Sequence, residues 1–586
     1  MGVIMLNDRY HKYVYGLAIA IVLPVGFAQA ATITVGLGES IQEAIDAAEP
    51  GDTIKVQSGI YLENVNVTKQ LTLVGLDTGS GMPIVDAGGN GNAITLSVDG
   101  IFLEGFEATN ASAGLAGTGK YVFLELPVDE ERNVGSKDVP PSGEEGSSHE
   151  VIPRPLATLP PLDGEFVPSK PPKTQIHGKA GIMIGSNGNM VVGNSVREND
   201  YGILLISSSN NTIRGNKVTN SQNGGIDLKS SSYNFIEDNN VAHNLRGIGL
   251  QNSDHNTLTD NNASNSITMM GSGIELSQSQ NNILRNNSMV GSAINFICSG
   301  ADLYYNDVDV SNLVDGRLIY VLRNVSGAII DSSSNAGTVC CFDCENVTIK
   351  DSLLDNNFCG IFLYNTNGST VENNSASENE EGISIIGGCD NLIESNYVNN
   401  NLFDGIKLES SDDNAIIGNE IVNNGLDGII LSDSDNNTVT RNNASNNENG
   451  ISLVGSNENE IYLNDFRNNI KNNAISATSL SDPDNKNLTN FWNSTEPITY
   501  RYNGSGFVGY MGNYWSGHEG VDADGDGLGD EPYVMDGIMD NLYCITDGGA
   551  VVDLSEAFAA VPSEDEQPLM EPLERYTITE AAENLP

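Results

Sequence analysis

Basic residues are scarce in this sequence. Its 586 residues include 78 Asp and Glu but only 27 Lys and Arg, which gives a formal net charge of −51. So acidic a surface repels nucleic acid and anionic lipid, and we expect neither as a partner. The composition instead favours cations and neutral or weakly charged carbohydrate.

Aromatic residues and cysteines are also few. Aromatics make up 6% of the chain, so a core has to be built mainly from Ile, Val and Leu. An odd number of cysteines at irregular spacing indicates no disulfide framework; the seven are Cys298, Cys340, Cys341, Cys344, Cys359, Cys389 and Cys544. Cys341 and Cys344 form a CxxC motif, which leaves three interpretations open: small buried residues, a local disulfide and a soft-metal site.

A long apolar run occurs only near the N-terminus. The run covers residues 14–27, basic residues precede it, and Ala28-Gln29-Ala30 follows it as a small-x-small cleavage signal. About 14 apolar residues are too few for a membrane span, which needs about 20. We therefore expect a signal peptide over residues 1–30, a secreted or cell-surface protein, and no membrane span in the mature chain.

A repeat accounts for most of the remaining sequence. A Gly-Ile pair recurs in steps of 21 to 23 residues, apart from one step of 26 and one gap of 87 that is close to four periods, at Gly181, Gly202, Gly225, Gly247, Gly273, Gly360, Gly382, Gly405, Gly428 and Gly450. Short patches with period-2 alternation, separated by Asn, Gly and Ser, predict two or three short strands per repeat. The fixed period predicts an all-β solenoid, a parallel β-helix with one coil per repeat.

Asparagine recurs at two positions of the repeat. The first row is Asn211, Asn234, Asn256, Asn282, Asn391, Asn414, Asn437 and Asn459, and the second is Asn216, Asn239, Asn261, Asn287, Asn374, Asn396, Asn419, Asn442 and Asn464. Asn tolerates left-handed turns, and its amide can bond the backbone of neighbouring coils. We expect both rows to be structural ladders and not a ligand-binding strip.

The ends and one interruption complete the predicted organisation. A capping box, Ser40 to Glu43, predicts a short helix with Ile41, Ala44, Ile45 and Ala48 on one face, which would cover the first coil. Residues 126–175 contain ten prolines and no periodicity, which predicts a long insertion. The expected segments are 31–125 for the cap and first coils, 126–175 for the insertion, 176–510 for the main repeats, 511–550 for a C-terminal cap and 551–586 for an acidic tail.

The residue after each Gly-Ile pair should point outward and stack from coil to coil. This row reads Met183, Leu204, Asp227, Gly249, Glu275, Phe362, Ser384, Lys407, Ile430 and Ser452. Asp227 and Glu275 lie two coils, roughly 10 Å, apart, and with Lys229 they are weak catalytic candidates. No catalytic motif accompanies them, so a solvated mixed face is favoured. Phe362 and Tyr364 are the candidates for a sugar-binding face.

Four aspartates occur within nine residues in DADGDGLGD (522–530). Their spacing matches a calcium loop, with side chains at positions 1, 3 and 5, a carbonyl at 7 and a further ligand at 9. These positions are Asp522, Asp524, Asp526, Leu528 and Asp530, with Asp536 or Asp540 able to supply the missing bidentate ligand. We expect a structural Ca²⁺ that closes the C-terminal end of the solenoid.

Two stretches resemble a known family. ESIQEAIDAAEPGDTIKVQSGIYLENVNV resembles the start of pectin-lyase-like right-handed β-helix proteins, and GNYWSGHEGVDADGDGLGDEPYVMDG (512–537) resembles NosD-type β-helix proteins. NosD-type proteins are secreted and are abundant on the surface of methanogenic archaea. The resemblance implies a right-handed, single-stranded β-helix. It also implies copper, because the best-known member is a periplasmic copper-binding protein, although the histidines of this chain are scattered.

The sequence thus favours a non-catalytic, secreted or cell-surface β-helix protein that binds carbohydrate or has a structural or interaction role in the cell envelope. The first alternative is a polysaccharide lyase, hydrolase or epimerase on the same scaffold. The second is a periplasmic copper-binding accessory protein. Fold alone does not decide between them.

Overall fold

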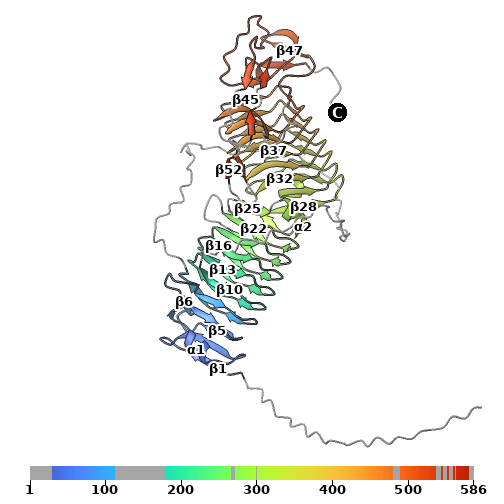
Figure 1. Cartoon of the computed structure of the whole chain (residues 1–586). Coiled ribbons are helices and arrows are strands. Elements are labelled where there is room, and N and C mark those ends of the chain that lie inside the picture. Colours follow the sequence, from blue (N-terminus) through green and yellow to red (C-terminus); the bar gives the residue numbers. More distant parts are fainter. Residues whose placement is uncertain are drawn as a thin grey trace, which may run out of the picture.

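The computed structural model describes residues 30–111, 179–264, 271–292, 294–298, 300–479, 489–535, 543–545, 551–553, 558–560 and 563–579. It confirms the predicted right-handed parallel β-helix. Short strands pair in register from coil to coil, and the coils stack along a rod with α1 at one end and β47 at the other (Figure 1). The expected signal peptide and the 126–175 insertion lie outside the described residues.

The coils of the first half visit three sheets in turn. Sheet 1 contains β1 (Thr32–Val35), β2 (Thr53–Gln57), β5 (Thr72–Leu76), β8 (Phe102–Glu104), β11 (Met190–Val192), β14 (Thr212–Arg214), β17 (Phe235–Glu237), β20 (Thr257–Thr259), β23 (Ile283–Arg285) and β26 (Asp307–Val308). Sheet 2 contains β4 (Val65–Val67), β7 (Ile94–Leu96), β10 (Ala180–Ile184), β13 (Tyr201–Ile206), β16 (Gly224–Lys229), β19 (Arg246–Gln251), β22 (Ser272–Ser277) and β25 (Ile294–Cys298). Sheet 3 begins with β3 (Ile60–Leu62), β6 (Ile84–Asp86), β9 (Glu107–Thr109), β12 (Ser195–Arg197), β15 (Lys217–Thr219), β18 (Asn240–Ala242), β21 (Asn262–Ser264), β24 (Ser288–Met289) and β27 (Leu313–Val314).

The second half continues sheet 3 and adds two further sheets. Sheet 3 goes on through β28 (Arg317–Arg323), β30 (Ala336–Phe342), β32 (Cys359–Tyr364), β34 (Glu381–Ile386), β37 (Ile406–Glu409), β40 (Asp427–Ser432), β43 (Asn449–Val454) and β46 (Asn472–Ser479). Sheet 4 contains β29 (Ile329–Ile330), β31 (Thr348–Lys350), β33 (Thr370–Glu372), β35 (Leu392–Glu394), β38 (Ala415–Ile417), β41 (Thr438–Thr440) and β44 (Glu460–Tyr462). Sheet 5 contains β36 (Tyr397–Asn399), β39 (Glu420–Val422), β42 (Asn443–Ser445), β45 (Asp465–Arg467) and β49 (Tyr514–Trp515).

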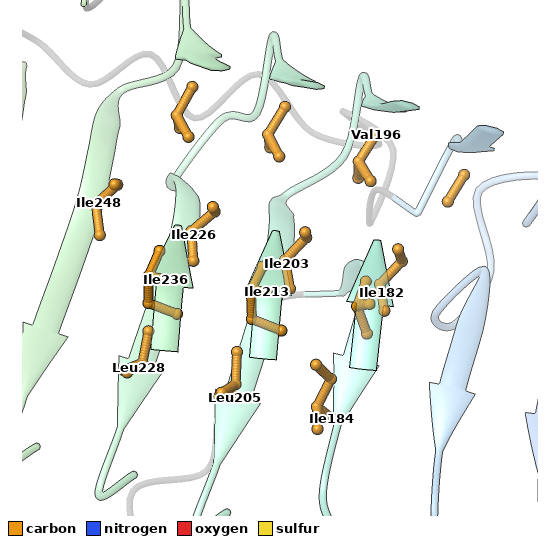
Figure 2. Packing of buried hydrophobic residues seen from close by; sticks show 14 of the residues in the cluster. Ile182, Ile184, Val196, Ile203, Leu205, Ile213, Ile226, Leu228, Ile236 and Ile248 are labelled. Atoms are coloured by element: carbon orange, nitrogen blue, oxygen red, sulfur yellow. The ribbon is translucent and has the colours of Figure 1, made fainter. Parts of the chain in front are cut away.

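Aliphatic side chains fill the axis of the solenoid in stacked columns. Ile182, Ile203, Ile226 and Ile248 form one such column and are fully buried. Figure 2 shows this column beside those of Leu205 and Ile213. Each coil thus buries one or two aliphatic side chains per strand against the coils on either side, which is how a repeat with no core of its own becomes stable.

Both predicted asparagine rows are buried ladders. In a typical link, the backbone N and Nδ2 of Asn211 donate to Oδ1 of Asn234 at 2.9 and 3.0 Å. A third ladder in the second half was not predicted; it consists of Asn357, Asn379, Asn401, Asn424, Asn447 and Asn469. The ladders satisfy the polar groups of the corners, which would otherwise be buried without partners.

The two halves meet at an antiparallel joint that the repeat pattern did not predict. β27 and β28 pair antiparallel across Asp315 and Gly316, whose φ angles of 47° and 77° are typical of a type I′ hairpin turn. The strand direction of sheet 3 reverses there. The 87-residue gap between Gly-Ile pairs therefore contains this joint and the short helix α2 (Gly300–Tyr305) instead of four ordinary coils.

The core changes to the opposite face of sheet 3 at the joint. Val339 and Cys341 of β30 point into the second core, whereas Cys340 and Phe342 of the same strand pack with the first core. The outer face of the second half thereby covers the end of the first half. The chain is thus two β-helices in series that share one sheet.

Both ends of the rod are closed. Helix α1 (Ile41–Ala47) buries Ile41 and Ile45, and Ser40 caps its first turn by accepting from Glu43 N. The carboxylate of Glu63 also accepts from Ile41 N at 2.8 Å, which places a charge from the first coils at the helix N-terminus. Among the described residues, no helix is long and apolar enough to cross a membrane.

The C-terminal cap extends further than predicted. It contains β47 (Ile498–Tyr502), β48 (Ser505–Gly509), β50 (Tyr533–Met535), β54 (Ser563–Asp565), β55 (Tyr576–Ile578) and a 3-10 turn at Leu573–Arg575. Between β50 and β54 in the chain, β51 (Tyr543–Ile545) pairs with β52 (Val551–Asp553), and β53 (Phe558–Ala560) pairs with β46. A second 3-10 turn, Ser332–Ser334, lies between β29 and β30. The stretch 551–586 is therefore not simply an acidic tail. Asp565 is fully buried, and its carboxylate accepts from Asn513 N and Trp515 Nε1, which anchors β54 in the cap.

Candidate functional site

The outward row on the Gly-Ile strands stacks as predicted but is not a solvated face. Met183, Leu204, Asp227, Gly249 and Glu275 lie side by side on β10 to β22. Leu204 and Asp227 are each only 1% exposed. The side chain of Arg246, which starts β19, lies across Asp227 and Glu275, so the prediction of a solvated face is wrong here.

Arg246 connects the two acidic candidates of the first half. One guanidinium nitrogen of Arg246 contacts Asp227, and the other lies 3.2 Å from Glu275. Burial raises the pKa of Asp227, while the charges of Arg246 and Lys229 oppose that rise. The charge of Asp227 in turn raises the pKa of Arg246, which stays protonated.

Lys229 contacts Tyr201 and makes no ion pair with Asp227 or Glu275 among the interactions of the described residues. Its Nζ lies 3.0 Å from the hydroxyl of Tyr201 and 4.4 Å from the centre of that ring. Asp227, Lys229 and Glu275 therefore do not converge on a shared open space, as an acid-base pair acting on a glycosidic bond must. Sequence reasoning missed Arg246, although it is the only basic residue at the position before Gly-Ile.

A second acidic row runs along the Gly-Ile strands of the second half. Glu381, Asp404 and Asp427 precede the Gly-Ile pair in three successive coils, a signal that the sequence analysis did not use. Lys407 Nζ lies 3.3 Å from Glu381, and Asp404 accepts from Asp427 N at 3.0 Å. Asn449 Nδ2 donates to Asp427 at 2.8 Å.

These carboxylates are held in a protein interior with one lysine among them. Burial raises the pKa of Asp427 to about 6 and that of Asp404 well above its usual value. Burial also raises the pKa of neighbouring Glu380 to about 7, with the charges of Glu381 and Glu275 adding to the effect. Asp404 and Asp427 therefore titrate at higher pH than exposed carboxylates do, and the row presents no open catalytic pair.

Of the two predicted sugar-binding aromatics, Phe362 is not accessible. It is 6% exposed and packs against Phe342 at the joint, with 5.7 Å between ring centres. Together with Phe296 and Leu303 it lines a cavity of about 20 Å³, the size of one water. Tyr364 is 38% exposed at the edge of this cluster. The face exchange of the core explains the burial of Phe362, since its outward side meets the first half.

Exposed aromatic residues gather instead on sheet 1 of the first half. Tyr233 is 53% exposed and Phe235 is 52% exposed. The ring of Tyr233 stacks on His255 of the next coil, with 4.8 Å between the centres and 20° between the planes. Tyr233 and His255 have φ angles of 60° and 58°, at a corner where the neighbouring coils have Gly188, Asn210 and Asn281.

Phe235 also belongs to an outward apolar row. The row contains one outward residue from each of six successive strands of sheet 1, four apolar and two threonine: Phe102, Met190, Thr212, Phe235, Thr257 and Ile283. Met190 and Ile283 are 44% and 40% exposed. We call this row, together with Tyr233 and His255, the aromatic strip. Six coils at the strand spacing make it about 24 Å long. Exposed apolar side chains gathered on one face are typical of an interaction site, and the sequence analysis missed them because the rings come from different positions of the repeat.

The predicted calcium loop brings three of its aspartates together. Carboxylate oxygens of Asp522, Asp524 and Asp526 lie within 4.8 Å of one another. Asp530 instead accepts a hydrogen bond from Ala523 N at 2.7 Å, and the side chain of Leu528 is buried in the cap. Burial and the charges of Asp524 and Asp522 raise the pKa of Asp526. Asp536 and Asp540 lie outside the described residues.

A copper site is not evident in the part of the chain that the structure describes. There, the only group of three or more His, Cys, Asp and Glu close enough to hold an ion is the all-oxygen set of the calcium loop. Carboxylates suit hard cations, whereas copper prefers thiolate, thioether and imidazole. His255 stacks on Tyr233, and His518 packs edge-on against Tyr533 at 5.6 Å, so these histidines do not converge.

Comparison with solved structures gave many distant matches. The periplasmic alginate epimerase AlgG is 14% identical with a TM-score of 0.24, covering 53% of this chain and 66% of AlgG. The alginate lyase from Paenibacillus sp. str. FPU-7 is 13% identical with a TM-score of 0.27, covering 59% and 94%. The catalytic domain of a GH87 α-1,3-glucanase is 12% identical with a TM-score of 0.28, covering 79% and 68%. Similarity this low says nothing about activity.

Among curated proteins, no sequence match was found. The family model described as "Periplasmic copper-binding protein (NosD)" matches residues 173–320 and 306–520. These ranges cover the Gly-Ile repeats of both β-helices, the joint between them and the start of the C-terminal cap. They amount to more than half of the chain, which therefore belongs to the NosD family.

Proposed function

We propose that this protein acts outside the cytoplasm as a non-catalytic β-helix that binds carbohydrate through the aromatic strip. The observation that carries the proposal is the exposed ring surface of Tyr233, Phe235 and His255. Aromatic rings held out into water by a rigid scaffold are costly unless a partner covers them, and the apolar faces of sugar rings stack on such surfaces.

The shape and charge of the molecule narrow the class of carbohydrate. The strip runs parallel to the rod axis, so an extended polysaccharide can lie along several coils at once. The net charge of −51 disfavours acidic polymers. We therefore expect neutral or amino-sugar polymers of the cell envelope to be bound in preference to polyuronates.

The buried state of the Gly-Ile row supports the non-catalytic reading. Asp227 is enclosed beside Arg246, and the carboxylates of the second row are enclosed beside Lys407 and Asn449. A glycosidase needs two carboxyl groups that both reach the substrate. Membership in the NosD family favours export. Among the described residues, however, no three His or Cys side chains lie close enough together to hold a copper ion.

We also propose a structural Ca²⁺ at Asp522, Asp524 and Asp526. Three carboxylates so close repel one another unless a cation or protons offset their charge. Asp522 and Asp526 each accept backbone hydrogen bonds within the loop, which holds it in a compact turn. The ion would fix this loop against the end of the second β-helix.

The test of carbohydrate binding compares two variants. The purified chain is incubated with insoluble neutral polysaccharide, with chitin and with alginate, and bound protein is measured against concentration. Tyr233→Ala with Phe235→Ala should weaken binding to the preferred polymer by at least about tenfold, as for the central aromatic residues of other interfaces. The matched control is Tyr397→Ala, a 47% exposed tyrosine on β36 away from the strip.

Two results would overturn the proposal. One is binding that is equal in the strip variant and in the control. The other is release of reducing sugar or of unsaturated product from any of these polymers, with or without calcium, that disappears in Asp227→Ala. The second result would show that the Gly-Ile row is catalytic despite its burial.

A further inference from the structure

One corner of the coils has the same pair of residues in seven of the ten Gly-Ile repeats. A leucine points into the core and a serine follows three residues later, at Leu205 and Ser208, Leu228 and Ser231, Leu250 and Ser253, Leu276 and Ser279, Leu408 and Ser411, Leu431 and Ser434, and Leu453 and Ser456. Every one of these leucines and serines is buried. The serine hydroxyl bonds a nearby carbonyl, as Ser411 Oγ does to Glu409 at 2.8 Å.

In the first full coil of the second β-helix both members of this pair are cysteine. Cys341 stands in register with Leu363, and so takes the leucine position. Cys344 takes the serine position, because its N donates to Thr366 Oγ1 at 3.3 Å and its thiol donates to Phe342 O at 3.3 Å. Cys298 of β25 also takes the leucine position, in register with Leu276, but no other described coil has cysteine at both positions.

The two cysteines share one core, and both thiols are free in the structure. Both residues are fully buried in the same hydrophobic cluster. Interaction with the Cys341 thiol is the largest cause that lowers the pKa of Cys344 to about 7, and interaction with Cys344 is the largest cause that raises the pKa of Cys341.

We infer that Cys341 and Cys344 form an intrachain disulfide that staples the first coil beside the joint. The oxidant is a disulfide of a small thiol or of an oxidoreductase outside the cytoplasm. The Cys344 thiolate attacks one sulfur of that disulfide and forms a mixed disulfide, releasing the first thiol. Cys341, deprotonated, then displaces the second thiol. The two cysteines lose two electrons, the oxidant gains them, and both protons end on the released thiols.

The exchange takes place while the coil is folding, before the next coil buries both sulfurs. Other cysteines of the region are poor candidates for this chemistry. Cys340 points to the opposite face of β30, and burial raises its pKa to about 12. Burial likewise raises the pKa of Cys359 well above its usual value. The staple is independent of the proposed carbohydrate binding.

The experiment counts protected thiols by position. The full chain is refolded with oxidised and reduced glutathione, unfolded without reductant, alkylated, and mapped by peptide mass spectrometry. Cys341 and Cys344 should remain unlabelled and become labelled only after reduction. Labelling of both residues before reduction, at the level of Cys389, would overturn the inference.

The repeat itself provides the matched control. Cys341→Leu with Cys344→Ser restores the pair that seven other coils contain and should fold like the parent. In this double variant the number of thiols that appear on reduction should fall by two. Cys389→Ser should leave the protected pair unchanged. An unchanged number in the double variant, or loss of protection in Cys389→Ser, would show that other cysteines are paired.

Discussion

At the scale of single residues, the ladder asparagines are highly connected polar side chains, because each one bonds to the coil before it and to the coil after it. Asn261 Oδ1 accepts from Asn239 N at 3.1 Å and from Asn239 Nδ2 at 3.0 Å. Its own Nδ2 donates to Ile236 O at 2.8 Å and to Asn287 Oδ1 at 3.0 Å. A side chain with four such contacts leaves several buried groups without partners when it is removed.

Asn261→Ala should therefore lower the free energy of unfolding by about 2–4 kcal/mol, the cost of leaving buried polar groups unsatisfied. Denaturant unfolding measures the loss. The control is Asn286→Gly, at an exposed corner where φ is 54°, a left-handed backbone conformation that glycine adopts without strain. It should change stability by less than about 0.5 kcal/mol. Equal losses in the two variants would mean that the ladder contributes nothing beyond the corner.

Residues with a fixed place in the repeat were predictable, and those that depart from it were not. The asparagine rows follow from periodicity and from the turn preference of Asn, and their burial is confirmed. The role of Arg246 was not predicted, because it depends on two glycines in neighbouring coils. Gly224 leaves room for the side chain of Asp227, and Gly249 leaves room for that of Arg246. The exposure of Tyr233 and Phe235 was not predicted, because exposure depends on the folded surface and not on a position in the repeat.

At the scale of elements, the acidic row of β34, β37 and β40 should make stability depend on pH. Asp427 has a folded pKa of about 6 and Glu380 one of about 7, both above the usual values for unfolded carboxyl groups. The folded state thus binds more protons than the unfolded state in this range. Its extra stability is complete below about pH 4 and is lost as the pH rises through 6 to 7.

Asp427→Asn should flatten this dependence. Asn keeps an oxygen for Asn449 Nδ2 and Ser452 Oγ, both 2.8 Å from Asp427 Oδ1, and carries no charge. The parent should lose on the order of 1–3 kcal/mol more than the variant between pH 4.5 and pH 8. Thermal melting at closely spaced pH values measures the difference. Parallel curves for the two proteins would contradict the assignment.

The calcium loop gives a second prediction at this scale. With millimolar affinity, 10 mM Ca²⁺ should stabilise the C-terminal cap by about 1.4 kcal/mol, and a chelator should reverse the effect. Asp524→Asn should abolish the response. Hydrogen exchange of β47 and β55 reports the cap separately from the solenoids. An equal response to Mg²⁺, or none to either ion, would count against the site.

On the scale of the whole molecule, two separate cores predict two units of unfolding. Ile226 lies in the first core and Ile416 in the second, and both are fully buried. Ile226→Ala and Ile416→Ala should each cost about 3 kcal/mol. Hydrogen exchange should show the loss of protection mainly in the mutated half. A uniform loss over both halves would show that the joint makes them one cooperative unit.

The fold class was predictable because the Gly-Ile period recurs ten times, so that irregular coils do not hide it. The joint was not, because reversal of a sheet occurs once and leaves no periodic trace. Its only local signal is the Asp315-Gly316 pair between Leu313-Val314 and Arg317-Leu318, a hairpin signature. The burial of Phe362 follows from that reversal, and so could not be inferred before the joint was known.

The exchange of core faces at the joint also bears on how such a chain can change in length during evolution. Coils on either side contact only their neighbours, so duplication or deletion of one 22- or 23-residue unit extends or shortens one rod by a single strand spacing, about 4.8 Å. The hairpin between β27 and β28 stays untouched. The distance of the aromatic strip from the joint, and of the cap from the joint, can therefore be adjusted independently by genetic insertion of whole coils.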